Sequence, residues 1–321
     1  MKYIIFSFLL FSISTFTVNA QWHEKNFHVM GTQAKVQFWY DDAKKAGLLI
    51  SAVENEMERI NQSMSPYIES SELSQVNLNA AKQPFKISDE LFNLLIKANN
   101  IARLSNGAFD ITYASVGYQY HYRDKIKPNE KAIKANLNKI NYQGITLDKE
   151  NKTIFFSIEG MKIDLGGIAK GYAVKTSLRL LEQAGVKHAL VSAGGDTGLL
   201  GDKRGKPWVV GIKHPRAEQK NAVHLPLENE AISTSGDYER YFIENGERYH
   251  HILNPKTGKS AKEVVSVSVI GKDPTMVDAL STTLFVLGLK PAMKMIDSLA
   301  GYEVIIIDKN QKLHFSKGLT Q

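Results

Sequence analysis

The chain has 321 residues, of which 43% are hydrophobic, and a formal net charge of +7. This length is enough for one large core or two closely joined domains, and the modest positive charge is compatible with small anionic ligands or a membrane surface. Because Lys and Arg form no continuous blocks, we exclude nucleic acid as a partner. The sequence contains no cysteine, which excludes disulfides, thiolate metal sites and thiol nucleophiles, so a metal must be held by oxygen or imidazole.

Residues 1–20 have the pattern of a cleaved secretory signal. Lys2 supplies an early positive charge, an apolar run covers 4–13, and a small-residue ending covers 18–20. An uncleaved membrane anchor is the alternative, but a span needs about 20 apolar residues and Ser and Thr interrupt this stretch. We predict an exported, periplasmic protein whose mature chain, 21–321, is a single domain. It is not a lipoprotein, because no cysteine follows the cleavage site.

Apolar spacing and turn residues predict interleaved helices and strands. The spacing over 41–64 is helical, and Ser88 is typical of the N-cap of a second helix. Asn245-Gly246 is typical of a tight turn between two strands. The other expected elements are a hairpin around 148–151, a strand over 264–270, a helix over 275–287 and a strand over 304–307. This irregular order favours an α+β fold with mixed sheets over a doubly wound parallel sheet.

Five stretches are richer in glycine, aspartate and threonine than an ordinary core. In the first, 106–112, Asp110 follows the aromatic Phe109 and can aim a carboxylate at a ligand, although a plain helix end explains this stretch better when it is taken alone. The second, 162–171, predicts a strand, a glycine turn and a helix whose first N–H groups suit an anion. Lys170 lies in the first turn of that helix, within reach of a phosphate. Phosphate binding and simple turn chemistry explain the second stretch equally well.

The third and fourth stretches each end a strand. In the third, 189–197, a buried strand runs into paired glycines, and a crowded sheet bend is favoured over close approach to a ligand. The fourth joins 233–238 to 250–258 and places His251 before an Asn-Pro turn. An imidazole there can orient a substrate or take a proton, although a histidine satisfied by the turn backbone is the commoner case.

The fifth stretch, 273–283, combines a carboxylate with hydroxyl groups. Asp278 and Thr282 are four residues apart and therefore share one helix face. A carboxylate, a hydroxyl and nearby carbonyls suit a hard cation such as Mg²⁺. Asp278 also stands three residues after Thr275, as in a capping box, so helix capping is an equal alternative.

Together and in this order, the five stretches resemble the FAD:protein FMN transferase (ApbE-like) family. The resemblance runs from 29–32 to the helix of Asp278, and its most specific segments are 164–173, 234–238, 251–258 and 278–282. It implies an α+β fold with two lobes around a flavin cleft, with FAD as substrate and Mg²⁺ as cofactor. Such an enzyme links FMN through its phosphate to a threonine hydroxyl of a target protein and releases AMP.

The resemblance also implies roles for individual residues. The residues expected to line the FAD site are Met30, Tyr67, Ala108, Phe109, Asp110, Asp164, Lys170 and Ile252. The residues expected to hold the metal are Asp278, Thr282, Ser281 and, through its backbone, Gly167. Within this scheme we predict that His251 is the base that removes the proton of the threonine hydroxyl.

Two other functions fit the same residues. An FAD pyrophosphatase would use water in place of threonine, and a flavin carrier would bind FAD without chemistry, although the Asp278/Thr282 pair argues against a carrier. The export signal predicts an acceptor in a threonine-bearing subunit of an extracytoplasmic or membrane redox complex, and the basic charge is compatible with association at a membrane surface. The positions that depart from the family pattern, and bear on target choice and rate, are Ile111, Tyr118-Gln119, Lys175 and Asn254.

Overall fold

The computed structural model describes residues 20–217 and 219–320. Its largest element is an eight-stranded sheet in which every neighbouring pair is antiparallel. In spatial order its strands are β1 (Gln21–Val29), β2 (Thr32–Tyr40), β6 (Ala189–Ala193), β7 (Asp196–Leu200), β10 (Ala231–Gly236), β15 (Val264–Gly271), β16 (Tyr302–Asp308) and β17 (Leu313–Phe315). The predicted signal lies outside the described residues except for Ala20. Among the helices that are described, none has the length and apolar character to cross a membrane.

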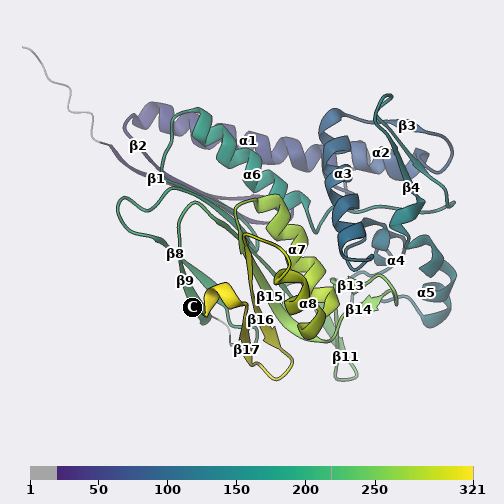
Figure 1. Cartoon of the computed structure of the whole chain (residues 1–321). Helices are drawn as coiled ribbons and strands as arrows, with labels where there is room; N and C mark the ends of the chain where they lie inside the picture. The colour runs from purple at the N-terminus through teal and green to yellow at the C-terminus, as the bar shows by residue number, and fades with distance from the viewer. Residues whose placement is uncertain (1–19, 218, 321) are drawn as a thin grey trace, which may run out of the picture.

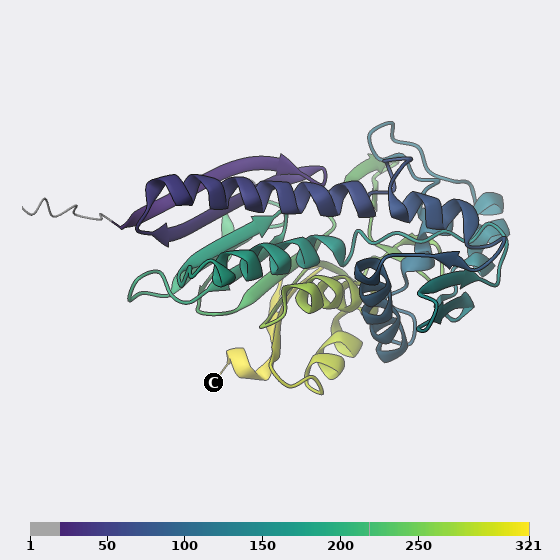
Figure 2. The same cartoon turned by 90° about the horizontal axis from the view of Figure 1, so that it is seen from above.

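Helices and a hairpin cover the two faces of this sheet. The helices α1 (Ala43–Met64), α6 (Ala169–Gln183), α7 (Pro274–Leu287) and α8 (Leu289–Ile296) lie on one face (Figures 1 and 2). The hairpin of β8 (Trp208–Lys213) and β9 (Asn221–Leu227) covers the other. Val269 and Ile270 are adjacent on β15 and therefore point to opposite faces, and they belong to two separate apolar clusters. The sheet is thus buried on both sides at its centre.

A second lobe of helices and a small sheet stands at the right of Figure 1. Its elements are α2 (Glu72–Asn79), α3 (Asp89–Leu104), α4 (Ala114–Gly117), α5 (Glu130–Asn136) and the antiparallel sheet β3 (Phe85–Lys86), β5 (Thr153–Phe156) and β4 (Ile145–Asp148). Helix α1 runs along both lobes (Figure 2), and its Met57 and Ile60 share one apolar core with Leu91 of α3 and Val36 of β2. This arrangement is the α+β fold in two lobes that was predicted, and the strand pairing in its described sheets is antiparallel.

Short elements complete the chain and connect the lobes. They are the hairpins β11 (Tyr241–Glu244)/β12 (Glu247–His250) and β13 (Leu253–Asn254)/β14 (Lys259–Ser260), and the 3₁₀ turns η1 (Ile111–Tyr113), η2 (Leu137–Lys139), η3 (Tyr142–Gly144) and η4 (Lys317–Leu319). The predicted turn between β11 and β12 is confirmed. Asn245 and Gly246 have φ of 52° and 78°, as a type I′ hairpin requires.

The predicted helix start at Ser88 is confirmed, and the helix predicted over 41–64 begins two residues later, at Ala43. Asp42 precedes α1, and its carboxylate accepts hydrogen bonds from the backbone N–H groups of Lys44 and Lys45 (both 3.0 Å). Ser88 precedes α3, and its Oγ accepts from the N–H of Leu91 (3.2 Å). Both residues satisfy N–H groups that a helix leaves free at its first turn, which is why such residues mark helix starts in a sequence.

The strand predicted at the start of 162–171 is wrong. Side chains take the backbone groups of this segment in place of a neighbouring strand. Asn77 accepts from the N–H of Ile163 (2.7 Å) and donates to its carbonyl (2.9 Å), and Ser115 Oγ accepts from the N–H of Lys162 (3.0 Å). Because these groups are already satisfied, the segment forms no strand and leads directly into the turn before α6.

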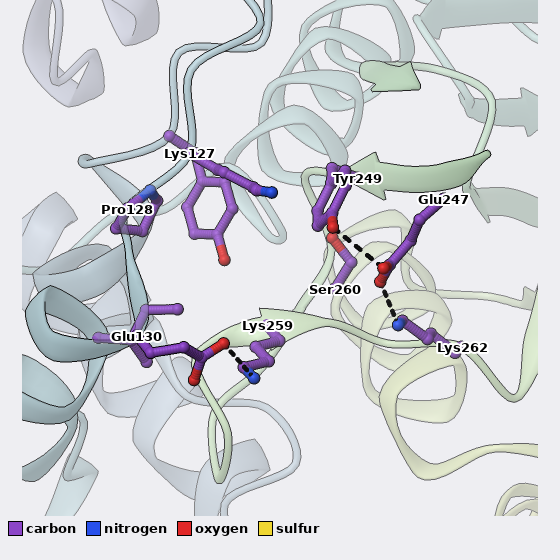
Figure 3. Close-up of a pocket in the computed structure, with 10 residues that line it drawn as sticks. Lys127, Pro128, Glu130, Glu247, Tyr249, Lys259, Ser260 and Lys262 are labelled. Carbon is purple, nitrogen blue, oxygen red and sulfur yellow. Dashed lines mark hydrogen bonds and ion pairs between the residues drawn. The ribbon is translucent and has the colours of Figure 1, made fainter. Parts of the chain in front are cut away.

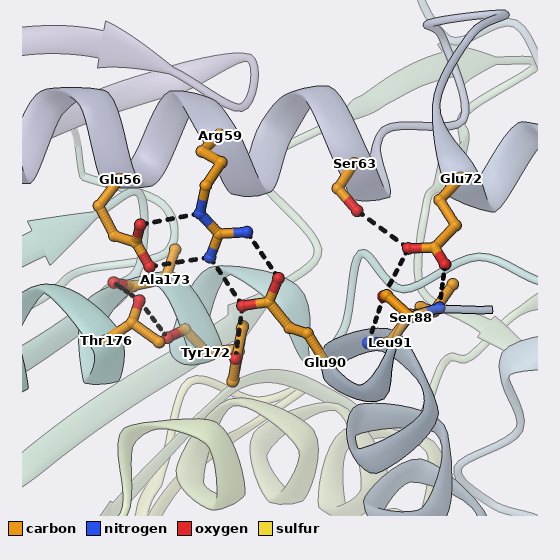
Figure 4. A network of polar contacts seen from close by, with 10 residues as sticks. All are labelled: Glu56, Arg59, Ser63, Glu72, Ser88, Glu90, Leu91, Tyr172, Ala173 and Thr176. Atoms are coloured by element: carbon orange, nitrogen blue, oxygen red, sulfur yellow. Dashed lines mark hydrogen bonds and ion pairs between the residues drawn. The ribbon is translucent and has the colours of Figure 1, made fainter. Parts of the chain in front are cut away.

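A network of polar side chains joins α6 to both lobes (Figure 4). The guanidinium of Arg59 on α1 donates to both carboxylate oxygens of Glu56 (2.9 Å each) and of Glu90 on α3 (2.6 and 2.7 Å). Glu90 also accepts from the hydroxyl of Tyr172 on α6 (2.7 Å). Three helices are therefore fixed to one another one turn away from the glycine turn at the start of α6.

Candidate active site

The turn before α6 is held by the carboxylate of Asp164. One of its oxygens accepts from the N–H of Gly166 (2.7 Å) and the hydroxyl of Tyr113 (3.0 Å), and the other accepts from the hydroxyl of Tyr118 (3.1 Å). Tyr118 is one of the positions that depart from the family pattern. Its hydroxyl contributes directly to the orientation of a predicted FAD residue, so this departure is part of the site and not a remote substitution.

Helices α6 and α7 cross in close contact at Gly171. A Cβ at this position would lie 2.3 Å from the carbonyl oxygen of Pro274 and 2.6 Å from Cβ of Asp278. Only glycine fits there. The close approach lets the N–H of Gly171 donate to Asp278 Oδ2 (2.8 Å). Asp278 is only 2% exposed, and its carboxylate therefore points into the start of α6.

The capping alternative for Asp278 is wrong. The N-cap of α7 is Asp273, whose carboxylate accepts from the N–H of Thr275 (3.0 Å). Lys97 and Lys175 pair with the same carboxylate at 2.8 and 3.1 Å. Lys175, another departure from the family pattern, thus belongs to the cap of α7, while Asp278 remains available for the site.

Lys170 lies between two buried carboxylates. Its ammonium pairs with Asp196 Oδ2 on β7 and lies 3.7 Å from Asp278 Oδ1. Burial opposes the charge of Lys170, but the charges of Asp196 and Asp278 outweigh burial and raise its pKa. Burial and the neighbouring charge of Asp196 raise the pKa of Asp278. When both carboxylates are ionised, one ammonium leaves a net negative charge, which favours a further cation.

Asp196 is a site residue that the sequence did not identify. It lies in the third stretch, directly after Gly194-Gly195, where a crowded bend was the favoured interpretation. That interpretation is correct for Gly195, because a Cβ there would lie 2.7 Å from the carbonyl oxygen of Thr234. The bend also turns Asp196 toward Lys170, and Asp196 Oδ1 is buried without a hydrogen-bond partner among the described residues.

Hydroxyl groups of α7 and β10 extend the cluster. Ser281 Oγ lies within hydrogen-bond distance of Ser233 Oγ (3.1 Å) and Ser235 Oγ (2.9 Å) and donates to the carbonyl of Asp278 (2.8 Å). Ser235 Oγ is also 3.2 Å from Thr282 Oγ1. Ser281 Oγ therefore has three hydrogen-bond contacts inside the protein. Among the described residues, the hydroxyl of Thr282 has one such contact, with Ser235.

Gly167 meets Thr282 and Phe109. A Cβ built at Gly167 would lie 3.3 Å from Thr282 Oγ1 and 3.3 Å from Phe109 Cε2. Ile168, the residue before α6, makes no side-chain cap. The N–H of Gly166 in this turn donates to Asp164, and the N–H of Gly171 in the first turn of α6 donates to Asp278. Residues predicted for the metal and for FAD thus come together at one end of α6.

These groups fit a hard divalent cation. Across 20–217 and 219–320, three or more His, Asp or Glu side chains do not gather as a conventional metal cluster. Mg²⁺ uses only one or two carboxylates and completes its shell with hydroxyls, carbonyls, water or substrate phosphate. Asp278, Thr282 and the backbone of Gly167 supply such oxygens, and the unpartnered oxygen of buried Asp196 is a fourth. The donor set is compatible with Mg²⁺ held together with a phosphate ligand.

The two adjacent histidines have different roles. His250 is satisfied internally, since its Nε2 contacts the carbonyl of Ala261 (2.7 Å) and its Nδ1 accepts from the N–H of Ile252 (3.3 Å). His251 Nδ1 is buried and has no hydrogen-bond partner in the described part of the chain. Burial, with the positive charges of Arg240, His250 and Lys170, lowers the pKa of His251 to about 3. His251 is therefore neutral at pH 7 and has a nitrogen free to take a proton.

The remaining residues that were predicted to line the FAD site differ in how deeply they are buried in the protein. Ala108 and Ile252 are buried in the apolar cluster that α7 forms with β15. The buried carboxylate of Asp110 accepts from the backbone and hydroxyl of Thr112 and from the N–H of Tyr142. These protein donors occupy both of its oxygens, so Asp110 holds the loop of Phe109 in place.

Met30 and Tyr67 are the accessible members of the predicted FAD group. Met30 lies in the tight turn between β1 and β2 with a φ of 52°, and it packs against the main apolar core. Tyr67 follows α1 and is 83% exposed. An aromatic ring left in water suits stacking on a planar ligand.

Two surface hollows lie away from this cluster. Each has a volume of about 250 Å³. The one in Figure 3 is lined by paired charges, among them Lys259 with Glu130 (2.6 Å) and Lys262 with Glu247. Neither hollow includes a predicted FAD, metal or base residue. The candidate site is therefore identified by the chemistry of the side chains at α6 and α7 and not by the volume of a surface hollow.

Fold and site together define an α+β protein with an acidic, hydroxyl-rich centre beside the first turn of α6, which suits a cation held together with a phosphate ligand. The chain belongs to the ApbE family, whose model matches residues 30–306, and the predicted family is thereby confirmed.

Relatives and solved structures agree with this assignment. The FAD:protein FMN transferase of Haemophilus influenzae is 32% identical over 269 residues, 80% of this chain and 78% of the relative. That of Vibrio cholerae is 31% identical over 78% of this chain and 76% of its own. The crystal structure of the ApbE protein of Thermotoga maritima has a TM-score of 0.85 at 33% identity and covers 94% of this chain and 98% of its own. The flavin transferase ApbE of Vibrio cholerae has a TM-score of 0.84 at 27% identity, over 94% and 99%.

Proposed function

We propose that this protein is a magnesium-dependent FAD:protein FMN transferase, which moves FMN from FAD to a threonine hydroxyl of an acceptor protein and releases AMP. The names of the curated relatives support transfer of flavin from FAD to protein. The observation that carries the proposal is the meeting of Lys170, Asp196 and Asp278 with Gly167 and Thr282 at the start of α6.

In the proposed reaction one phosphoanhydride bond is exchanged for one phosphoester bond. The threonine oxygen bonds to the phosphorus of the FMN half, the bond from that phosphorus to the bridging oxygen breaks, and AMP leaves with the bridging oxygen. The main requirement is neutralisation of charge and in-line positioning. Lys170 supplies positive charge, and Mg²⁺, when bound by Asp278, Thr282 and Gly167, supplies Lewis acidity.

His251 receives the threonine proton at Nδ1 in this scheme. Its pKa is low because burial and the charges of Arg240 and Lys170 disfavour the imidazolium. The negative charges of a bound diphosphate oppose those cations and raise the pKa of His251 toward its ordinary value. FAD binding therefore makes His251 a stronger base at the moment when the acceptor hydroxyl enters.

A transfer assay tests the proposal against its two alternatives. Residues 21–321 are mixed with FAD, Mg²⁺ and a threonine-bearing segment of a periplasmic flavoprotein subunit. Expected are an acceptor mass increased by FMN and equal release of AMP, both abolished by EDTA. Free FMN with an unmodified acceptor would identify a pyrophosphatase, and intact FAD after long incubation would identify a carrier.

Two variants of α7 separate the metal site from the helix cap. We expect Asp278→Asn to lower the transfer rate at limiting Mg²⁺ by about 100-fold or more, as loss of a charge-stabilising group does. Asp273→Asn removes a carboxylate from the same helix, but Asn is an equally good N-cap, so its rate stays within about twofold of wild type. Equal rates in the two variants would contradict the metal assignment.

We also propose that the mature protein is exported to the periplasm, supported by the signal pattern at 1–20. The acceptor is then a subunit of an extracytoplasmic or membrane redox complex, with association at a membrane surface favoured by the basic charge. Cell fractionation, with the N-terminal mass of the recovered chain, tests this. A cytoplasmic chain that begins at Met1 would disprove it.

A further inference from the structure

Arg240 connects two parts of the candidate site that are distant in sequence. It precedes β11, and its carbonyl accepts a hydrogen bond from the N–H of His251 (3.1 Å). Its guanidinium reaches the turn between β1 and β2, because a Cβ built at Gly31 would lie 3.6 Å from Arg240 Nη2. The positive group therefore stands between the predicted base and the turn that carries Met30.

The guanidinium of Arg240 is exposed and has no ion-pair partner in the described part of the chain. Other arginines with defined roles are paired. Arg59 contacts Glu56 and Glu90, and Arg216 holds Asp237 with two bonds of 2.7 and 2.6 Å. An arginine beside a site without an acidic partner retains its full capacity for an anionic ligand.

The charge of Arg240 acts on the interior of the site. After burial, it is the largest influence that lowers the pKa of His251, and it also opposes the charged state of Lys170. Both effects require the guanidinium to lie near these two groups. Arg240 is thus close to the reacting centre although its side chain is open to solvent.

The centre needs such a cation. The ammonium of Lys170 is already matched by the carboxylates of Asp196 and Asp278, which together leave one net negative charge when both are ionised. The diphosphate of FAD brings two more negative charges. A guanidinium suits this ligand because its fork of N–H donors matches the spacing of phosphate oxygens.

We propose that Arg240 binds the diphosphate of FAD and positions it between the start of α6 and His251. This inference rests on the proposed function for the identity of the ligand. It adds a substrate contact at a position that the sequence did not single out, on the segment that links the motif 234–238 to the hairpin of His251.

The test compares FAD with riboflavin, which has the same ring system and no phosphate. Binding of each to residues 21–321 is measured by flavin fluorescence in EDTA. We expect Arg240→Gln to weaken FAD binding by about 10-fold or more, the usual effect of losing a charge-assisted bond, and to leave riboflavin binding unchanged. Arg240→Lys keeps the charge without the fork and should recover part of the loss.

Arg204→Gln is the matched control. It removes the same charge from an exposed arginine that lies over the ring of Trp39 (4.8 Å). Trp39 is near the end of β2 that is remote from Gly31, about 26 Å away at the usual rise of a strand. We expect this variant to bind FAD like wild type.

Three results would overturn the inference. The first is FAD binding in Arg240→Gln equal to that of wild type. The second is equal weakening of both ligands, which would indicate a disturbed β1–β2 turn. The third is weakening of FAD binding in Arg204→Gln to the same extent. Failure of the proposed function gives a different result, since the wild-type protein itself would then bind no FAD, or would bind FAD without transferring FMN to the acceptor.

Discussion

Two clusters of oppositely charged side chains contact α6, one around Arg59 and one around Lys170. They differ in whether every carboxylate oxygen has a hydrogen-bond donor. In the Arg59 network every carboxylate oxygen of Glu90 has a donor, and the arginine is half exposed (Figure 4). In the Lys170 cluster both carboxylates are buried, and Asp196 Oδ1 has no partner in the described residues. A solvated network in which every carboxylate oxygen has a donor holds helices together. A buried cluster with an unpartnered carboxylate oxygen and excess negative charge can instead bind a cationic ligand.

The largest difference is expected when the cation of each cluster is removed. Lys170→Met leaves two buried carboxylates without a counter-charge, and we expect the free energy of unfolding at pH 7.5 to fall by about 3 kcal/mol. Urea titration measures this. The loss should shrink on addition of Mg²⁺, because a bound cation replaces the ammonium.

Lys175→Met is the control on the same helix. Lys175 is partly exposed and shares Asp273 with Lys97, so its removal should cost less than about 1 kcal/mol. If the two lysine variants lose equal stability, the ammonium of Lys170 is not needed to balance the charge of two buried carboxylates.

A second effect separates chemistry from binding. We expect His251→Gln to lower the transfer rate by about 100-fold, in the range for loss of a general base, while FAD binding is retained. His250→Gln is the comparison, and it should mainly lower stability because His250 joins Ile252 to Ala261. Full transfer activity in His251→Gln would remove His251 from the mechanism.

The pH dependence of stability gives a smaller effect of defined sign. The pKa of His251 is about 3 in the folded protein and about 6.5 in an unfolded chain. As pH falls from about 6.5 to 3, the unfolded state binds a proton at this position that the folded state does not, so wild type loses stability relative to His251→Gln. Urea titrations at pH 7.5 and 5 measure this, and an unchanged difference between wild type and variant would contradict the low pKa.

The smallest effect is expected in the Arg59 network. Arg59→Ala removes a bidentate but partly exposed arginine, so the free energy of unfolding should fall by about 1 kcal/mol. The transfer rate should not change, because the network does not contact the site. Arg103→Ala, on the exposed surface of α3, is the control. A loss of activity in Arg59→Ala larger than its loss of stability would show that this network also shapes the site.

Local patterns predicted most of the elements correctly. The helix over 41–64 follows from apolar spacing, the start at Ser88 from a side chain that caps the first turn, and the hairpin at Asn245-Gly246 from two residues that tolerate positive φ. Each signal acts over a few neighbouring residues. The strand predicted at 162–165 failed because Asn77 and Ser115, far away in the chain, take its backbone groups.

The features of the site that depend on neighbouring residues were also predictable, and those that depend on residues far apart in the chain were not. By itself, the sequence determined the chemical groups of the site, the glycine turn before α6 and the family that combines them. Only the tertiary structure decided that Asp278 faces Lys170 rather than capping α7, that Asp196 pairs with Lys170, and that the guanidinium of Arg240 lies at the turn that carries Met30. The reason is physical: the contact of Gly171 with Asp278 joins residues 107 positions apart, and the charges of such a cluster act through space rather than along the chain.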